Sequence, residues 1–161
     1  MNLYIDVDGV LLGRTVPDRP AVVIASHTRE FLSFALSRFD CYWLTTHCQG
    51  DSRGVLTYLR KYVDPGLEGL MSGIRPTRFD VMKTEALAGD FVWLDDAPLG
   101  CELAWLRDRG LLDRWIDVDT RRRPDDLLRA MEVLTRRLAG RPAPAPGRLT
   151  EIGGDGSRPG W

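Results

Sequence analysis

The 161-residue sequence predicts an α/β fold, a three-layer α/β/α, Rossmann-like arrangement around a parallel sheet. Short apolar runs alternate with segments whose apolar residues recur at helical spacing, as expected of βα units. Three of the runs end in polar side chains, and the first of them ends in Asp6-Val7-Asp8-Gly9. Ligands bind at the carboxyl ends of the strands in such folds, so we expect a site where these runs end.

The first part of the chain predicts two buried strands, each followed by a helix. Residues 2–7 and 41–45 are the strands, because both are apolar runs. Residues 28–39 are predicted to be a helix, since their apolar side chains recur every three or four positions. Asp51 is a candidate cap for the second helix, which is expected to stop before Asp64-Pro65-Gly66.

The middle of the chain is less regular. Residues 67–79 have no clear pattern and leave room for a short strand. Lys83 is expected to open a short helix, and residues 91–94 form the next clear strand. A helix over 99–109 is predicted to end at Gly110, a typical C-terminal stop.

The last predicted elements are a strand over 115–118 and a helix over 125–138. Residues 1–139 are therefore expected to form a single folded domain. Residues 140–161 are rich in proline and glycine and poor in apolar residues, so we expect a flexible tail there.

Composition limits the classes of function. A formal net charge of −1 argues against a general nucleic-acid-binding or membrane-surface protein. No apolar run approaches the length of a membrane span, and the N-terminus lacks the core of a signal peptide. The three cysteines lack metal-site spacing, so we expect reduced thiols, with Cys41 and Cys101 in the core, and a cytoplasmic protein.

The pair Asp6 and Asp8 is the strongest chemical feature of the sequence. Alternate side chains of a strand share a side, so both carboxylates are expected to lie together. Like charges this close are tolerated where a cation or a shared proton offsets them. Asp95-Asp96 repeats the pattern at another strand end. The simpler alternative is a turn in which the carboxylates cap backbone N–H groups.

Taken together, four motifs resemble the haloacid dehalogenase-like (HAD) phosphohydrolase superfamily. They occur in the family's order between residue 3 and about residue 120: Asp6-Val7-Asp8-Gly9-Val10, Tyr42-Trp43-Leu44-Thr45, Lys83, and Val92-Trp93-Leu94-Asp95-Asp96. The first and fourth motifs carry most of the specificity. The resemblance implies a Mg²⁺-dependent phosphatase that hydrolyses a phosphomonoester through an aspartyl-phosphate.

The resemblance also implies a role for each carboxylate. Asp6 would attack phosphorus, and Asp8 would protonate the leaving oxygen and then deprotonate the attacking water. Asp6 and Asp95 would supply carboxylate oxygens to Mg²⁺, and Asp8 its backbone carbonyl. Asp96 would be either a further ligand or the partner of a metal-bound water.

Thr45 and Lys83 would bind the transferring phosphoryl group and neutralise its charge. Thr46 is the competing choice for Thr45, and an ordinary strand-end hydroxyl is the simpler alternative for both. The chain has only two lysines among its 22 basic residues, so a lysine at position 83 is notable. Lysine is a compact point charge and suits a crowded metal-phosphate site better than arginine. A surface lysine is the alternative, and Arg75 and Arg78 are weaker candidates for the role.

Further candidates for substrate binding follow the second and the last strand. Thr46 and His47 come directly after the second, although a loop histidine is more often structural. Arg121 and Arg122, with Arg123, leave the sheet at the edge of the carboxylates. They would hold or steer a second anionic group of the substrate, and the alternative is a solvated loop.

The gaps between the motifs are too short for the cap domain that many HAD-like enzymes carry. The resemblance therefore implies an open, capless member, and such members often act on large substrates, such as phosphoproteins or nucleic-acid ends, or borrow a lid from a partner. The phosphorylated substrate stays open between a small molecule and a macromolecular end. A homodimer is one source of the missing lid. Two other functions stay open: a catalytically idle module that binds phosphate or a protein partner, and a phosphotransferase.

Overall fold

The computed structural model describes residues 1–14 and 21–140. The tail predicted over 140–161 lies outside these residues, apart from Gly140. No helix in the described part of the chain is long and apolar enough to cross a lipid bilayer.

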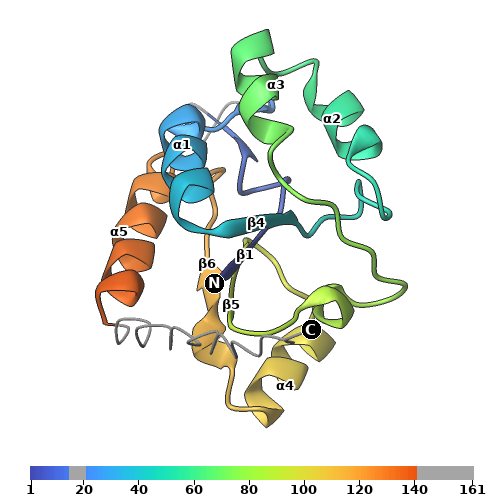
Figure 1. Ribbon diagram of the computed structural model, residues 1–161, viewed down its shortest axis with the longest axis vertical. Helices are drawn as coiled ribbons and strands as arrows, with labels where there is room; N and C mark the ends of the chain where they lie inside the picture. The colour runs from blue at the N-terminus through green and yellow to red at the C-terminus, as the bar shows by residue number, and fades with distance from the viewer. Residues whose placement is uncertain (15–20, 141–161) are drawn as a thin grey trace, which may run out of the picture.

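A four-stranded parallel sheet lies at the centre of the molecule (Figure 1). Its order is β4-β1-β5-β6, and the strands are Asp40–Trp43, Asn2–Ile5, Phe91–Asp95 and Trp115–Asp117, respectively. All four predicted strands are therefore present. β1 pairs with β4 on one side and β5 on the other, so the ends of these three strands are neighbours.

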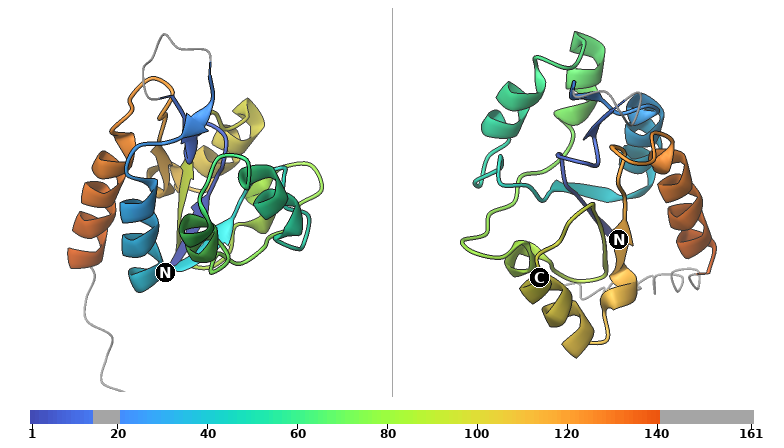
Figure 2. Two further views of the ribbon diagram at one scale, coloured as in Figure 1. Left: turned by 90° about the horizontal axis from the view of Figure 1, so that it is seen from above. Right: turned by 180° about the vertical axis from the view of Figure 1, so that it is seen from behind.

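Alternate residues of the strands pack into two separate apolar clusters. Leu3 and Ile5 of β1 contribute to the larger cluster, together with buried residues of α1 (Thr28–Arg38) and α5 (Asp126–Ala139). Tyr4 contributes to the smaller cluster, with residues of α4 (Gly100–Asp108). Figure 2 shows α1 and α5 side by side, with the sheet between them and α4. The protein is thus an α/β fold with a parallel sheet, which is compatible with a Rossmann-like fold.

Two short helices separate β4 from the third predicted motif. α2 (Arg53–Leu59) follows Asp51, whose carboxylate accepts a hydrogen bond from the Arg53 backbone N–H at 2.9 Å. α3 (Pro65–Met71) was not predicted, because Asp64-Pro65-Gly66 was interpreted as a stop. The Asp64 side chain instead caps α3 by accepting from two backbone N–H groups, and Pro65 occupies the first turn, where it has no N–H to satisfy.

The strand predicted somewhere in 67–79 is reduced to a single bridge. Arg75 pairs in parallel with Tyr42, and its backbone N–H donates to the Cys41 carbonyl at 2.9 Å. This segment therefore contacts the β4 edge of the sheet at one residue and does not add a fifth strand to it. The same stretch mostly forms α3 and the loop that leads to Lys83.

Three smaller elements complete the fold. β2 (Leu12–Gly13) and β3 (Val23–Ile24) pair antiparallel near the end of β1. Lys83 opens the 3₁₀ helix η1 (Lys83–Ala86), as predicted, and η2 (Leu112–Arg114) precedes β6.

One core prediction was wrong. Cys101 is exposed, whereas Cys41 is buried as expected. The buried face of α4 is formed by Glu102 and Leu106, and Cys101 is one residue, about 100° of helical rotation, away from Glu102. Gly110 does end the region of α4, with a positive φ of 65°.

Candidate functional site

Three carboxylates converge at the carboxyl end of the sheet. Asp6 follows β1, Asp95 ends the neighbouring β5, and Asp96 comes next in the chain. One oxygen of each lies within 4.8 Å of the others, and Asp6 and Asp95 are buried. The parallel sheet therefore brings together the two acidic motifs that the sequence placed at strand ends.

Lys83 lies between two of these carboxylates. Its Nζ is 3.0 Å from Asp6 Oδ2 and 2.5 Å from Asp95 Oδ2. The other candidates for this role lie elsewhere: Arg75 contacts Tyr42 and Asp40, and Arg78 is exposed beside Asp80. Of the three basic candidates for this role, Lys83 is the one that contacts Asp6 and Asp95.

Glu102 holds the start of η1 in place. Its carboxylate is buried on α4 and accepts hydrogen bonds from the backbone N–H of Lys83 at 2.6 Å and of Leu99 at 2.8 Å. A carboxylate that accepts two backbone N–H groups is fixed in position. Glu102 was not predicted from the sequence, where its position in the first turn of a predicted helix is the one signal of a capping role.

Burial dominates the electrostatics of the cluster. Desolvation, assisted by the neighbouring Asp95, raises the pKa of Asp6 to about 7, although Lys83 opposes the shift. Desolvation also raises the pKa of Asp96, against the effect of Arg121. For Lys83, burial lowers the pKa, but Asp6 and Asp95 outweigh it and the net pKa is raised. The protein alone thus leaves the cluster short of positive charge.

In the absence of divalent cations, the free energy of unfolding is expected to fall as the pH rises from about 4 to 7. Folded Asp6, with its pKa near 7, retains a proton that the unfolded chain has released above its ordinary pKa of 3.8. Its contribution to stability is therefore full below pH 4 and lost as the pH passes 7. The loss is of the order of a few kcal/mol.

Urea unfolding in a chelating buffer at several pH values measures this dependence. Asp6→Asn is the control, because its amide does not titrate. A difference between wild type and Asp6→Asn that stayed constant between pH 4 and 7 would contradict the assigned shift.

Asp8 makes contacts different from those of Asp6. β1 ends at Ile5, two residues earlier than predicted, so the two acidic side chains do not follow the alternation of a strand. Asp8 Oδ2 lies 3.0 Å from His47 Nε2, and Asp8 Oδ1 accepts a hydrogen bond of 3.1 Å from the Tyr58 hydroxyl. Asp8 is thus oriented by two side chains, while Asp6 faces Lys83.

The two partners of Asp8 stack on each other. The rings of His47 and Tyr58 are 3.9 Å apart and nearly parallel, with 14° between their planes. Burial, followed by the Asp8 charge, raises the pKa of Tyr58 to about 12, so the phenol remains a donor at neutral pH. His47 was a predicted candidate, whereas Tyr58, on α2, was missed because its contact with Asp8 spans 50 residues.

The chain turns sharply after Asp8. Gly9 has a φ of 79°, and a Cβ at this position would collide with the Asp96 carboxylate. Only glycine satisfies both conditions without strain. The glycine of the first motif therefore allows the first and fourth motifs to approach each other.

The two threonines of the second motif differ in burial. Thr45 is buried just beyond β4, and its Oγ1 accepts a hydrogen bond of 3.4 Å from the His47 backbone N–H. Its neighbour Leu44 pairs with Ile5 of β1, which places Thr45 at the same edge of the sheet as Asp6. Thr46 is exposed. Of the two, Thr45 has the placement expected of a phosphate-binding hydroxyl.

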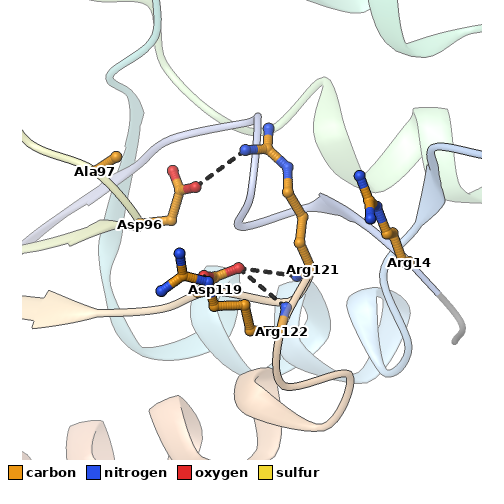
Figure 3. A pocket seen from close by; sticks show the side chains of 6 residues that line it. All are labelled: Arg14, Asp96, Ala97, Asp119, Arg121 and Arg122. Atoms are coloured by element: carbon orange, nitrogen blue, oxygen red, sulfur yellow. Dashed lines mark hydrogen bonds and ion pairs between the residues drawn. The ribbon is translucent and has the colours of Figure 1, made fainter. Parts of the chain in front are cut away.

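A cavity of about 570 Å³ adjoins the carboxylates. Its lining includes Asp96 and three arginines: Arg14, Arg121 and Arg122 (Figure 3). Arg121 Nη1 lies 3.2 Å from Asp96 Oδ2. Both predicted arginines thus line this cavity, and Arg14, which follows β2, was not predicted.

Comparisons with models of protein families, with curated proteins and with solved structures gave no match for this chain. The chemical character of the site therefore follows from its own residues. Asp6, Asp95 and Asp96 each offer a carboxylate oxygen within 4.8 Å of the others, a set that could hold a metal ion. The raised pKa of Asp6 agrees with a set of carboxylates that needs such a charge.

Proposed function

We propose that the protein is a Mg²⁺-dependent phosphatase of the HAD-like type, which hydrolyses a phosphomonoester through an aspartyl-phosphate. The observation that carries the proposal is the division of the first motif into two environments. Asp6 lies beside Lys83 in a buried acidic cluster, and Asp8 is held by His47 and Tyr58. A nucleophile and a proton carrier need these separate settings.

In the first step, a carboxylate oxygen of Asp6 attacks phosphorus. The new P–O bond forms as the bond to the leaving oxygen breaks, and Asp8 donates a proton to that oxygen. Lys83 and the Thr45 hydroxyl stabilise charge on the transferring group. The step requires a proton on Asp8, which is passed to the leaving oxygen, and the contacts with Tyr58 and His47 orient the Asp8 side chain.

In the second step, water attacks the phosphorus of the aspartyl-phosphate. Asp8, now a carboxylate, takes a proton from that water, and the P–O bond to Asp6 breaks. Inorganic phosphate leaves, Asp6 is again a carboxylate and Asp8 is again protonated. The proton is therefore returned within each turnover.

Asp6, Asp95 and Asp96 are the residues that would hold Mg²⁺, with the Asp8 backbone carbonyl as a further ligand. The cation would offset the repulsion between the attacking carboxylate and the anionic substrate. Arg121 contributes a fixed positive charge beside Asp96.

We further propose that the helices form the outer layers of a three-layer α/β/α sandwich and that the site has no cap domain. Between Thr45 and Lys83 the chain forms only α2, α3 and their connecting loops. α2 supplies Tyr58 to Asp8, which is a contribution to the site rather than a lid over it. Such an open site suits a substrate that extends beyond its phosphate.

Turnover of 4-nitrophenyl phosphate tests the proposed function. We expect slow hydrolysis that requires Mg²⁺ and is lost in a chelating buffer. Phosphate release equal to nitrophenol release indicates hydrolysis, whereas a deficit of phosphate in the presence of an alcohol indicates transfer. Folded protein that turns over no phosphomonoester with Mg²⁺, and that forms no beryllofluoride adduct at Asp6, would leave only the idle-module alternative.

A further inference from the structure

The cavity beside Asp96 is lined by three arginines, and the proposed chemistry gives a role to one of them, Arg121. Its lining contains three guanidinium groups and two carboxylates, those of Asp96 and Asp119 (Figure 3). Asp96 belongs to the proposed metal-binding set. Asp119 accepts backbone N–H groups of its own loop, and its Oδ2 also lies 3.3 Å from Arg122 Nε, while Asp96 contacts Arg121. Each of these two ion pairs uses one nitrogen of a guanidinium that carries five N–H donors.

Asp119 accepts backbone N–H groups of the loop that carries the arginines. Its Oδ1 lies 3.1 Å from the backbone nitrogen of Arg121 and 3.2 Å from the backbone nitrogen of Arg122. Its own N–H donates to buried Asp126 at 2.8 Å. Since Asp126 is in turn held by Arg123 and Arg129, the loop after β6 is anchored to the start of α5.

Thr120 ties the same loop to the first motif. It is fully buried, and both its backbone N–H and its hydroxyl donate to the Gly9 carbonyl, at 2.7 and 2.9 Å. Its carbonyl accepts from the Arg14 backbone N–H at 3.4 Å. A Cβ on Gly13 would collide with the Thr120 side chain, so the two segments approach closely. The backbones of Arg14 and Arg121 are therefore fixed relative to the acidic cluster.

The arginine cavity shares Asp96 with the proposed metal-binding set, so it lies beside the proposed reaction centre. Arg121 spans the two, because it lines the cavity and contacts Asp96 through a single nitrogen, Nη1. A guanidinium carries five N–H donors arranged for bidentate contact with phosphate or carboxylate. A substrate whose scissile phosphate lies at Asp6 would thus extend its remaining part toward these groups.

We infer that the Arg14–Arg121–Arg122 cavity binds a second anionic group of the substrate. The substrate class is a phosphomonoester that carries another phosphate or a carboxylate a few bonds from the scissile phosphate. This inference rests on the proposed phosphatase function for the identity of the first group. The volume of about 570 Å³ is ample for one such group and the linker that carries it.

Three substrates of matched length test the inference: butane-1,4-diol monophosphate, 4-phosphooxybutanoate and butane-1,4-diol bisphosphate. The expected kcat/KM of at least one doubly anionic compound exceeds that of the monophosphate by roughly 10- to 100-fold. The carboxylate and the bisphosphate distinguish which second anion is preferred. For the bisphosphate, kcat/KM is divided by a statistical factor of 2, since the molecule has two equivalent ends.

The ratio of kcat/KM for the preferred doubly anionic compound to kcat/KM for the monophosphate is expected to fall roughly tenfold in at least one of the variants Arg14→Gln and Arg122→Gln. Glutamine keeps a polar side chain and removes the charge. Arg136→Ala is the matched control, since its exposed side chain pairs with Glu132 on α5. It should leave the ratio as in wild type. A wild-type ratio close to 1, or a ratio unchanged in both glutamine variants, overturns the inference.

Binding of non-hydrolysable analogues separates this inference from the proposed function. Butane-1,4-bisphosphonate is expected to bind at least tenfold more tightly than butylphosphonate by calorimetry, and to lose this advantage in at least one of Arg14→Gln and Arg122→Gln. Equal affinities for the two phosphonates overturn the inference even where the monophosphate is hydrolysed. Tighter binding of the bisphosphonate without turnover of any substrate supports the anion site and rejects the phosphatase.

Discussion

Asp6→Asn is expected to lower the turnover of 4-nitrophenyl phosphate by about 10⁴-fold or more, to the level of the buffer. The amide is nearly the same size as the carboxylate, but its oxygen is a poor nucleophile. No aspartyl-phosphate can then form. Wild-type protein quenched in acid during turnover should carry one phosphate on the peptide that contains Asp6, and the variant should carry none.

The loss must be separated from misfolding. Asp6 is buried beside Lys83, so its replacement changes the charge of the cluster. Because the carboxyl already binds a proton readily, with a pKa near 7, a neutral amide is expected to be tolerated at neutral pH. A cooperative thermal transition of Asp6→Asn, close to that of the wild type, shows that the fold persists.

Asp95→Asn provides a matched comparison within the same cluster. It changes one neighbouring carboxylate in the same way but leaves the proposed nucleophile intact. We expect strongly weakened activity that higher Mg²⁺ concentrations partly restore, whereas no Mg²⁺ concentration restores Asp6→Asn. Equal restoration of both variants would assign Asp6 to metal binding alone.

The four strands could be predicted from the sequence because a buried parallel strand is a continuous apolar run. Polar residues where such runs stop, as at Asp95 and Asp96, also indicate, without any structure, the edge of the sheet where a site is expected. Their distances depend on the strand order, which follows from pairing between segments almost 90 residues apart. The sequence could thus predict that the carboxylates lie at the same edge of the sheet, but not the distances between them.

The missed residues all depend on tertiary contacts. Tyr58 and Arg14 have no distinguishing neighbours in the sequence, and their contacts are with segments far along the chain. Glu102 has a local capping signal at Leu99, but its contact with Lys83 spans 19 residues. α3 was missed for another reason, since Asp64-Pro65 is both a good helix start and a good helix stop. Packing against the rest of the fold determines whether such a sequence begins or ends a helix.

Asp8→Asn is expected to lower kcat/KM by roughly 10²- to 10⁴-fold for an alkyl phosphate, whose leaving oxygen needs a proton. The loss should be far smaller for 2,4-dinitrophenyl phosphate, because a dinitrophenolate departs without protonation. The second step still needs a base to take a proton from water. With the dinitrophenyl ester, the variant should therefore release one equivalent of phenol in a burst and then turn over slowly.

The contacts of Asp8 sharpen this prediction. Tyr58→Phe removes the 3.1 Å hydrogen bond but keeps a ring that can stack on His47. We expect a several-fold loss with alkyl phosphates and little change with the dinitrophenyl ester. Tyr42→Phe is the control, because the Tyr42 hydroxyl accepts a hydrogen bond from Arg75 at 3.1 Å.

The dependence on the leaving group distinguishes a proton carrier from a residue that only supports the fold. General destabilisation lowers the rates of all esters by a similar factor, since it reduces the amount of active protein. A proton carrier affects most the esters whose leaving oxygens are most basic. Equal losses for the alkyl and dinitrophenyl esters in Asp8→Asn, without a burst, would contradict the role proposed for Asp8 and transfer the protonation step to another group at the edge of the sheet.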